Sequence, residues 1–163
     1  MPVTFHQAWH PITAHFAVGL TLATTLLVVI GFIARIIGYR DFARRLTYPI
    51  HVTALLSLIA LVLVVLGALA DFPSATFAAS PWFKLKMGFA VTVFGVYAGL
   101  YMMVMLGKER IWDSPPMLVY TLILALLGGF MIMVLGAAGG YLACGHSVLE
   151  PLLKSQGFPL PRA

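Results

Sequence analysis

Four long apolar segments, separated by short stretches that contain polar residues, dominate the pattern along the chain. They cover residues 12–33, 49–70, 87–106 and 117–141. A helix needs about 20 apolar residues to cross a lipid bilayer, and each segment provides them. Segments of this length are too long to be strands of a membrane barrel. The pattern therefore predicts an all-α fold, a bundle of four transmembrane helices in which short links favour antiparallel neighbours.

The composition agrees with a protein that lies in a bilayer. The chain is 61% hydrophobic and 9% charged, with a mean hydropathy of +1.01, whereas about a quarter of the residues in a soluble domain are charged. A chain of 163 residues predicts a single integral membrane domain, 1–163. No Lys or Arg precedes the first segment, which is too long for a signal-peptide core, so it is expected to stay in the membrane. The tail 147–163 predicts an interfacial helix or a segment docked on a partner.

Basic residues predict the orientation of the bundle. The links after the first and third segments carry Arg35, Arg40, Arg44, Arg45, Lys108 and Arg110, and the opposite side carries Lys84, Lys86, Lys154 and Arg162. The positive-inside rule then places both termini outside. Aromatic residues are expected at the two membrane borders, with Trp9, Trp82 and Tyr141 outside and Tyr39, Tyr48 and Trp112 inside. Anionic lipid heads account for the pI of about 9.7, so no nucleic-acid partner is implied.

Several classes of function find no motif in the sequence. The single cysteine, Cys144, excludes an internal disulfide, and no CxxCH sequence is present for a covalently attached haem. Nucleotide-binding and zinc-protease motifs are also absent from the sequence. The sequence shows neither paired carboxylates nor a nucleophile–base pair, so it does not predict a stand-alone enzyme. The polar residues noted deep in the later segments outline no path across the membrane; they are Thr53, Ser57, Thr92 and Thr121.

Histidines at the start of the first segment carry the main functional signal. His10 and His15 flank Pro11 and the beginning of the apolar run, and His146 follows the last segment. With an even number of crossings these residues share the outer end of the bundle, together with Asp71 at the end of the second segment. His51 lies at the opposite, inner border. Ionisable residues in membrane segments usually face the bundle interior and often mark ion, proton or cofactor sites.

Two imidazoles on different helices are the axial ligands that a b-type haem requires. The sequence predicts His15 and His146 as ligands of the haem iron, or His10 in place of either. Gly19 and Gly139 would give room to the porphyrin, and Asp71 would support a ligand. On this hypothesis His15→Ala abolishes haem binding or destabilises the outer half of the bundle. Structural roles remain open for each residue: His10 as a helix cap, His15 bonded to a carbonyl or to Asp71, and His146 as an ordinary tail residue.

The string HPITAHF, His10 to Phe16, resembles the His-Pro-x-x-x-His-Phe signature of a bacterial family of four-helix inner-membrane proteins of unknown function. The segments LGALADF, 66–72, and GAAGGYLACGHSV, 136–148, are similar to its other conserved patterns. The resemblance implies a bacterial inner-membrane location and polar positions at His10, His15, Asp71 and His146. The chain departs from the family at Lys84 and Lys86, where a histidine is common, and at Ser147, where a glycine is. The likeness to small membrane cytochromes b is one of architecture only.

Three functions are compatible with these residues. The first is a membrane subunit of a respiratory or photosynthetic type of redox complex, with one haem b near the periplasmic face that passes electrons between a partner and quinone. The second is a non-catalytic anchor or assembly subunit of a larger complex, without a cofactor of its own. The third is a small metal-handling membrane protein. The expected partners are the lipid bilayer, other subunits of a complex and, for the first function, quinone.

Overall fold

The computed structural model of the protein describes residues 5–71 and 81–144, and it describes the side chains of 12–67, 84 and 87–136. Its elements are α1 (Phe5–Ile36), α2 (Arg40–Arg45), α3 (Thr47–Asp71), α5 (Pro81–Gly107), the 3-10 helix η1 (Lys108–Trp112) and α6 (Pro115–Cys144). Four of these helices are long and apolar enough to cross a membrane. The predicted all-α bundle of four membrane-spanning helices is therefore confirmed, and each helix extends past the apolar segment that predicted it. The proposed interfacial tail, 147–163, lies outside the described residues.

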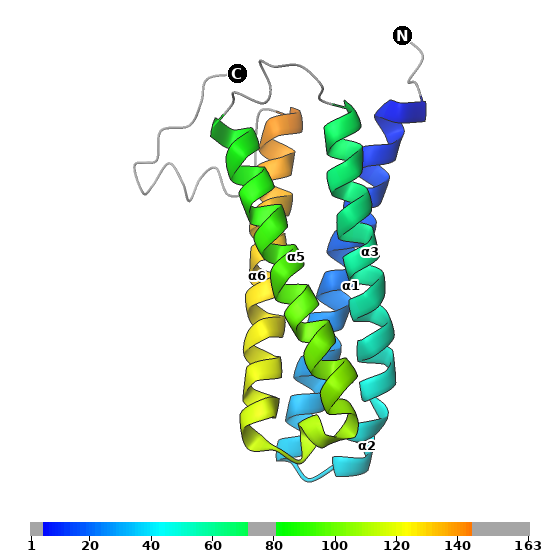
Figure 1. The fold of residues 1–163 in the computed structure, drawn as a ribbon, viewed down its shortest axis with the longest axis vertical. Helices are drawn as coiled ribbons and strands as arrows, with labels where there is room; N and C mark the ends of the chain where they lie inside the picture. Colours follow the sequence, from blue (N-terminus) through cyan, green and yellow to red (C-terminus); the bar gives the residue numbers. More distant parts are fainter. Residues whose placement is uncertain (1–4, 72–80, 145–163) are drawn as a thin grey trace.

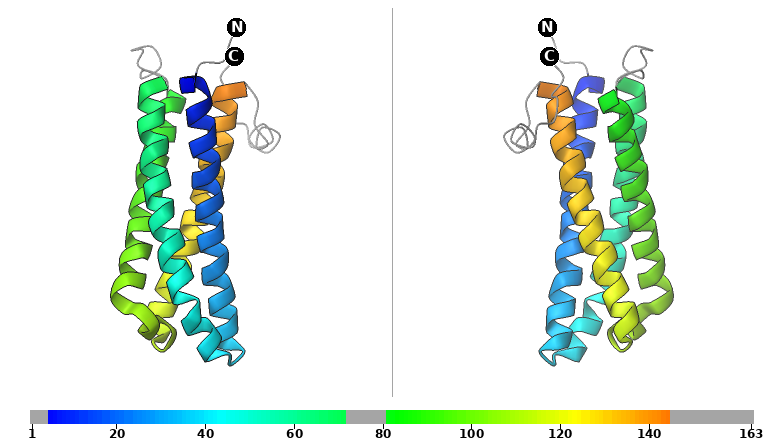
Figure 2. Two further views of the ribbon diagram at one scale, coloured as in Figure 1. Left: turned by 90° about the vertical axis from the view of Figure 1, so that its right-hand side faces the viewer. Right: turned by 90° about the vertical axis from the view of Figure 1, so that its left-hand side faces the viewer.

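The four long helices α1, α3, α5 and α6 run up and down in antiparallel order (Figure 1). Each packs on two neighbours, so that α1 contacts α3 and α6, and α5 contacts α3 and α6. The end at which α1 begins and α6 finishes is called here the terminal end. The opposite end, which carries α2 and η1, is called the linker end. Figure 2 shows both ends from two further sides.

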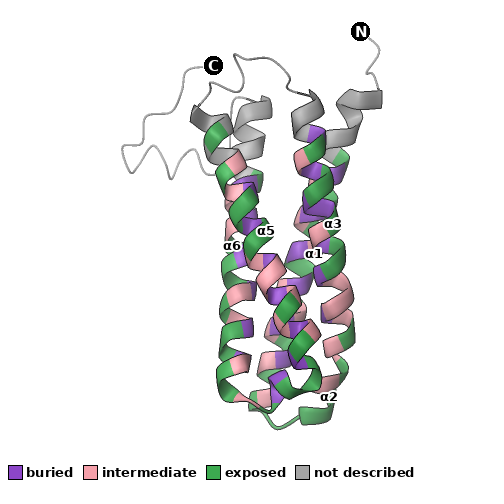
Figure 3. Ribbon diagram, in the orientation of Figure 1, coloured by how far each residue is buried: buried purple, intermediate pink, exposed green. Residues whose placement is uncertain are grey.

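The buried positions recur at seven-residue spacing along the helices, as expected for helices that pack along a common seam. Each long helix has a side with buried residues and a side with exposed residues (Figure 3). The repeated buried positions are Ala17, Thr24 and Gly31 on α1, Ile50, Ser57 and Val64 on α3, and Leu118, Ala125 and Ile132 on α6. The exposed sides carry large apolar residues such as Phe16, Leu26 and Phe130, which suit contact with lipid tails.

A hydroxyl cluster joins α1, α5 and α6 near the middle of the bundle. Tyr97 is fully buried, and its hydroxyl donates a hydrogen bond of 2.6 Å to the backbone carbonyl of Thr21. The Thr25 hydroxyl lies 3.0 Å from the Tyr97 hydroxyl and 3.0 Å from the carbonyl oxygen of Ala125. Tyr97 was missing from the deep polar residues named from the sequence, because its ring makes it read as part of an apolar run.

Two adjacent glycines make this cluster possible. A Cβ atom on Gly128 would overlap the ring of Tyr97, and one on Gly129 would lie 2.9 Å from the Thr25 hydroxyl oxygen. The small residues therefore let α6 approach α1 and α5 closely, as is typical of helix packing in membranes. Gly95 and Gly99 of α5, which have the spacing of a GxxxG motif, are less crowded. Gly95 has no such neighbour within 4 Å, and the nearest atom to a Cβ on Gly99 lies at 3.8 Å.

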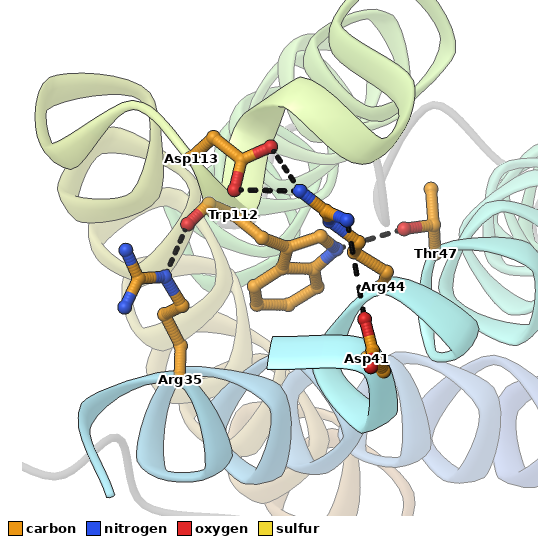
Figure 4. Close-up of polar contacts among 6 residues, drawn as sticks. All are labelled: Arg35, Asp41, Arg44, Thr47, Trp112 and Asp113. Atoms are coloured by element: carbon orange, nitrogen blue, oxygen red, sulfur yellow. Dashed lines mark hydrogen bonds and ion pairs between the residues drawn. The ribbon is translucent and has the colours of Figure 1, made fainter. Parts of the chain in front are cut away.

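The linker end is held by Trp112, which is 2% exposed (Figure 4). Its indole Nε1 donates to the Thr47 hydroxyl at 2.8 Å, and its carbonyl accepts from Arg35 Nε at 2.5 Å. Gly31 leaves room for the ring, because a Cβ there would overlap it. Trp112 lies at the end of the bundle where the sequence predicted it, but its side chain is buried in the protein and its N–H is bonded to Thr47. Tyr39 and Tyr48, predicted for the same border, are exposed.

Gly38 ends α1 because the chain adopts there a backbone conformation that residues with a Cβ rarely take. Its φ is 99°. The Tyr39 N–H donates to the carbonyl of Ala34 at 2.8 Å, and the Gly38 N–H donates to the carbonyl of Arg35 at 3.4 Å. This pair of bonds is the Schellman motif, which satisfies the last carbonyls of a helix. It turns the chain into α2 and from there into α3.

Gly128→Ala is expected to destabilise the bundle. The added methyl group must displace the ring of Tyr97 from a packed interior, which costs about 1–3 kcal/mol. The free energy of unfolding in mixed micelles measures this loss. Gly95→Ala on α5 is the matched control, because a Cβ there meets nothing within 4 Å. Equal stability of the two variants would contradict the close packing of Tyr97 on Gly128.

Tyr97→Phe tests the hydrogen bonds separately from the ring. Removal of the hydroxyl leaves the ring in place but breaks the bond to Thr21 and the contact with Thr25, and a loss of about 0.6–2 kcal/mol is expected for bonds of this kind within a membrane bundle. Tyr120→Phe on α6 is the control, since Tyr120 is 63% exposed. If both variants unfold at the same denaturant concentration, the hydroxyl cluster does not stabilise the fold.

Candidate functional site

Two contacts set the register between α1 and α6. Thr25 lies against Gly129, and Val18 lies 3.9 Å from the Cβ position of Gly136. The two pairs are seven residues apart on both antiparallel helices, so the register is constant between them. Each further residue adds about 1.5 Å on both helices. His10, eight residues beyond Val18, is therefore level with Cys144, eight residues beyond Gly136. His15 is level with Gly139.

The neighbouring helix α3 brings Asp71 to the same level. Thr24 and Ser57 face each other, with their hydroxyl oxygens 3.4 Å apart. His10 stands fourteen residues before Thr24, and Asp71 stands fourteen residues after Ser57. Both helices continue without a break to these positions. His10, Asp71 and Cys144 thus occupy one level of the bundle, at its terminal end. They lie on α1 and on the two helices that contact it, α3 and α6.

Helix phase separates the two histidines of α1. His10 stands seven, fourteen and twenty-one residues before Ala17, Thr24 and Gly31, all of which are buried, so its position falls on the inner face of the helix. Asp71 continues the inner face of α3 in the same way, seven residues after Val64. The His15 side chain is exposed, on the side of α1 opposite these positions. By this continuation of the helix phase, the position of His10 and the described side chain of His15 fall on different faces of α1.

The remaining residues singled out from the sequence at this end are His146, Gly19, Lys84 and Lys86. His146 lies outside the described residues. In the sequence it stands seven residues after Gly139 and fourteen after Ile132, which is buried. Gly19 is exposed, and no atom lies within 4 Å of a Cβ placed there. Lys84 is exposed, whereas Lys86 stands seven residues before Val93, another buried position.

A second candidate site is a hollow of about 390 Å³ at the linker end. It lies between the α2–α3 region and the α5–η1 region, and its lining consists of Arg44, Arg45, Thr47, Tyr48, His51, Val104, Met105, Lys108 and Glu109. The imidazole of His51 packs against the ring of Tyr101, with ring centroids 4.8 Å apart and a tilt of 42°. His51 therefore lies at the border that the sequence predicted, in a basic surrounding.

An ion pair ties the two sides of the linker end together. Arg44 Nη2 lies 2.9 Å and 3.1 Å from the two carboxylate oxygens of Asp113, and its other terminal nitrogen lies 3.9 Å from Asp41 (Figure 4). Both partners of the Arg44–Asp113 pair are partly exposed. A partly exposed pair contributes little to stability, about 0–1 kcal/mol. Its main effect is geometric, because it holds α2 against the link that follows η1.

Among the residues whose side chains are described, no three His, Cys, Asp or Glu residues form a group that could hold a metal ion. Comparison with family models, with curated proteins and with solved structures gives no match. The resemblance to four-helix inner-membrane proteins consequently depends on the quoted sequence motifs alone. Function is therefore argued from the geometry of the two ends of the bundle.

The hollow at the linker end was missed because its residues come from four separate elements. The sequence did show Arg44, Arg45 and Lys108 as basic residues on one side of the membrane, which was the available signal. It gave no indication that they surround a common space. The left-handed backbone of Lys108, with φ of 46°, was equally hidden, because glycine usually takes this conformation and the preceding residue is Gly107.

Lys108→Gly is expected to stabilise the protein. A side chain with a Cβ costs about 1–2 kcal/mol in the left-handed region, and glycine avoids most of this cost. The stabilisation should appear as a higher midpoint of unfolding in micelles. Lys108→Ala is the control, because it removes the same charge but keeps the Cβ. If alanine stabilises as much as glycine, charge and not backbone conformation explains the effect.

Proposed function

We propose that this chain is a membrane subunit of a redox complex and binds one haem b at its terminal end. His10 and His146 would be the axial ligands of the iron. The proposal is supported by the buried heptad positions Ala17, Thr24 and Gly31, whose continuation along α1 reaches His10. By residue counting along the helices, His10 is level with Asp71 and with Cys144, two residues before His146 in the sequence. His15, on the exposed face, is the less suitable ligand on α1.

The residues of the terminal end have the chemistry that such a site requires. A neutral imidazole binds the iron through one nitrogen and donates its other N–H to a second-shell acceptor, which fixes the tautomer. Asp71 is a suitable acceptor for His10. Lys86, which continues the buried positions of α5, would bring a positive charge to the acidic groups at the edge of the porphyrin. The haem would supply the one-electron chemistry.

The distribution of charge supports an orientation with both termini outside, and the resemblance of the HPITAHF string implies a bacterial inner membrane, in which these termini would be periplasmic. Arg35, Arg40, Arg44, Arg45, Lys108 and Arg110 all lie at the linker end, and that end is the cytoplasmic one by the positive-inside rule. The haem would then lie near the periplasmic face. Its electron partners would be another subunit or a periplasmic protein, and a quinone dissolved in the bilayer.

A second candidate is an anchor or assembly subunit without a cofactor. It is favoured by the interior of the described bundle, where the buried polar side chains are those of Thr13, Thr21, Thr24, Ser57 and Thr121. Such hydroxyls serve helix packing in membranes without any ligand. Transport of a metal ion is the weakest of the three alternatives, because Tyr97 and Thr25 fill the centre of the bundle with hydrogen-bonded groups.

A reduced-minus-oxidised visible spectrum tests the proposal, on protein purified in detergent with its native partners. A sharp α-band of the b type is expected, and it should disappear in His10→Ala and in His146→Ala. His15→Ala and His51→Ala are the matched controls, and both should retain the band. Loss of the band in His15→Ala but not in His10→Ala would transfer the ligand role to His15. A flat spectrum from folded protein would overturn the haem and favour the anchor subunit.

A further inference from the structure

We infer that the hollow at the linker end binds the phosphate of an anionic phospholipid headgroup. This site lies at the opposite end of the bundle from the proposed haem and does not depend on it. Its volume of about 390 Å³ is within the range of small-molecule sites. Its lining combines cations, hydroxyl groups and an apolar wall, which is the combination that a lipid head and the beginning of its tails require.

The charges of the lining favour a negatively charged ligand. The positive charge of Arg44 is matched by Asp113, to which it is bonded at 2.9 Å. Arg45 and Lys108 remain, both exposed, and Glu109 offsets one of them. Within the lining, three cations face one carboxylate, and Asp113 and Asp41 lie outside it against Arg44. A phosphodiester is an anion, so it complements the net positive charge of the lining.

Polar donors and an apolar wall divide the hollow. Thr47, Tyr48 and His51 of α3 offer groups that can donate hydrogen bonds to phosphate oxygens. Val104 and Met105 of α5 form an apolar surface on which the glycerol and upper acyl carbons can pack. The exposed ring of Tyr48 is of the kind that lies at the level of lipid heads.

Arg44 supplies a further indication of an acceptor. Within the described part of the chain its Nε is buried and has no hydrogen-bond partner. Buried donors are almost always bonded, so an unsatisfied one calls for an explanation. Arg44 also lines the hollow, so an anion bound there would lie beside this guanidinium group. Basic sites between membrane helices on the cytoplasmic side are known to hold acidic lipid heads.

The test measures the melting temperature of the detergent-purified protein with short-chain phosphatidylglycerol, with phosphatidylcholine of equal chain length, or with inorganic phosphate. Phosphatidylglycerol is expected to raise the melting temperature by several degrees more than the other two. The double variant Arg45→Gln, Lys108→Gln should lose at least half of this extra shift. The control Arg40→Gln, Arg110→Gln removes the same charge from the same end outside the lining, and it should keep the shift.

Each contrary outcome is informative. Equal loss in both double variants would overturn the site, because it would indicate attraction by net charge alone. A full shift with inorganic phosphate would overturn the lipid as ligand in favour of a soluble anion. Lys108→Gly guards against a folding artefact, since it is expected to raise the melting temperature without lipid and yet to reduce the shift with phosphatidylglycerol. If it leaves that shift unchanged, Lys108 does not take part in the site.

Discussion

The hydrogen bonds of Tyr97 are the interaction on which the rest of the bundle depends. In lipid, apolar side chains gain little by leaving the tails for the protein interior, so close packing and interhelical hydrogen bonds determine how helices associate. One hydroxyl at the centre reaches the carbonyl of Thr21, and Thr25 extends the cluster to Ala125 on α6. Because the cluster fixes α1, α5 and α6 along their axes, it also determines which residues meet at either end.

The two ends of the bundle are stabilised in different ways. At the linker end, Trp112 is enclosed by α1 and α3, and its polar atoms are bonded to Arg35 and Thr47. The partly exposed ion pair of Arg44 with Asp113 lies in the same region. At the terminal end the heptad positions of α1 and α3 are His10 and Asp71, whereas one heptad below they are the apolar residues Ala17 and Val64. Hydroxyl groups return two heptads below, where Thr24 and Ser57 face each other.

The fold could be predicted from the sequence because the length and apolar content of a segment identify a membrane helix. Four apolar segments predicted four helices, and each helix in the structure is longer than its segment because it continues into the flanking residues. The sequence could also group His10, Asp71 and His146 at one end, because depth follows from chain direction. It could not rank His10 against His15, since the ranking depends on helix phase, and the phase of α1 is read from the burial of Ala17, Thr24 and Gly31. Close approaches such as Tyr97 on Gly128 and Trp112 on Gly31 depend on the partner helix, and for this reason the sequence did not reveal that Trp112 is buried.

The seven-residue spacing of the inner faces has a consequence for how this chain can change its length. An insertion or deletion of one residue in α1 between His10 and Ala17 would turn His10 by about 100° and shift it by about 1.5 Å. The histidine would then leave the inner face although no contact of the central cluster had been altered. A whole heptad would restore the face but would move His10 by about 10.5 Å along the axis, out of level with Asp71 and Cys144. The geometry of the terminal end therefore fixes the length of α1 relative to α3 and α6, and not only its phase.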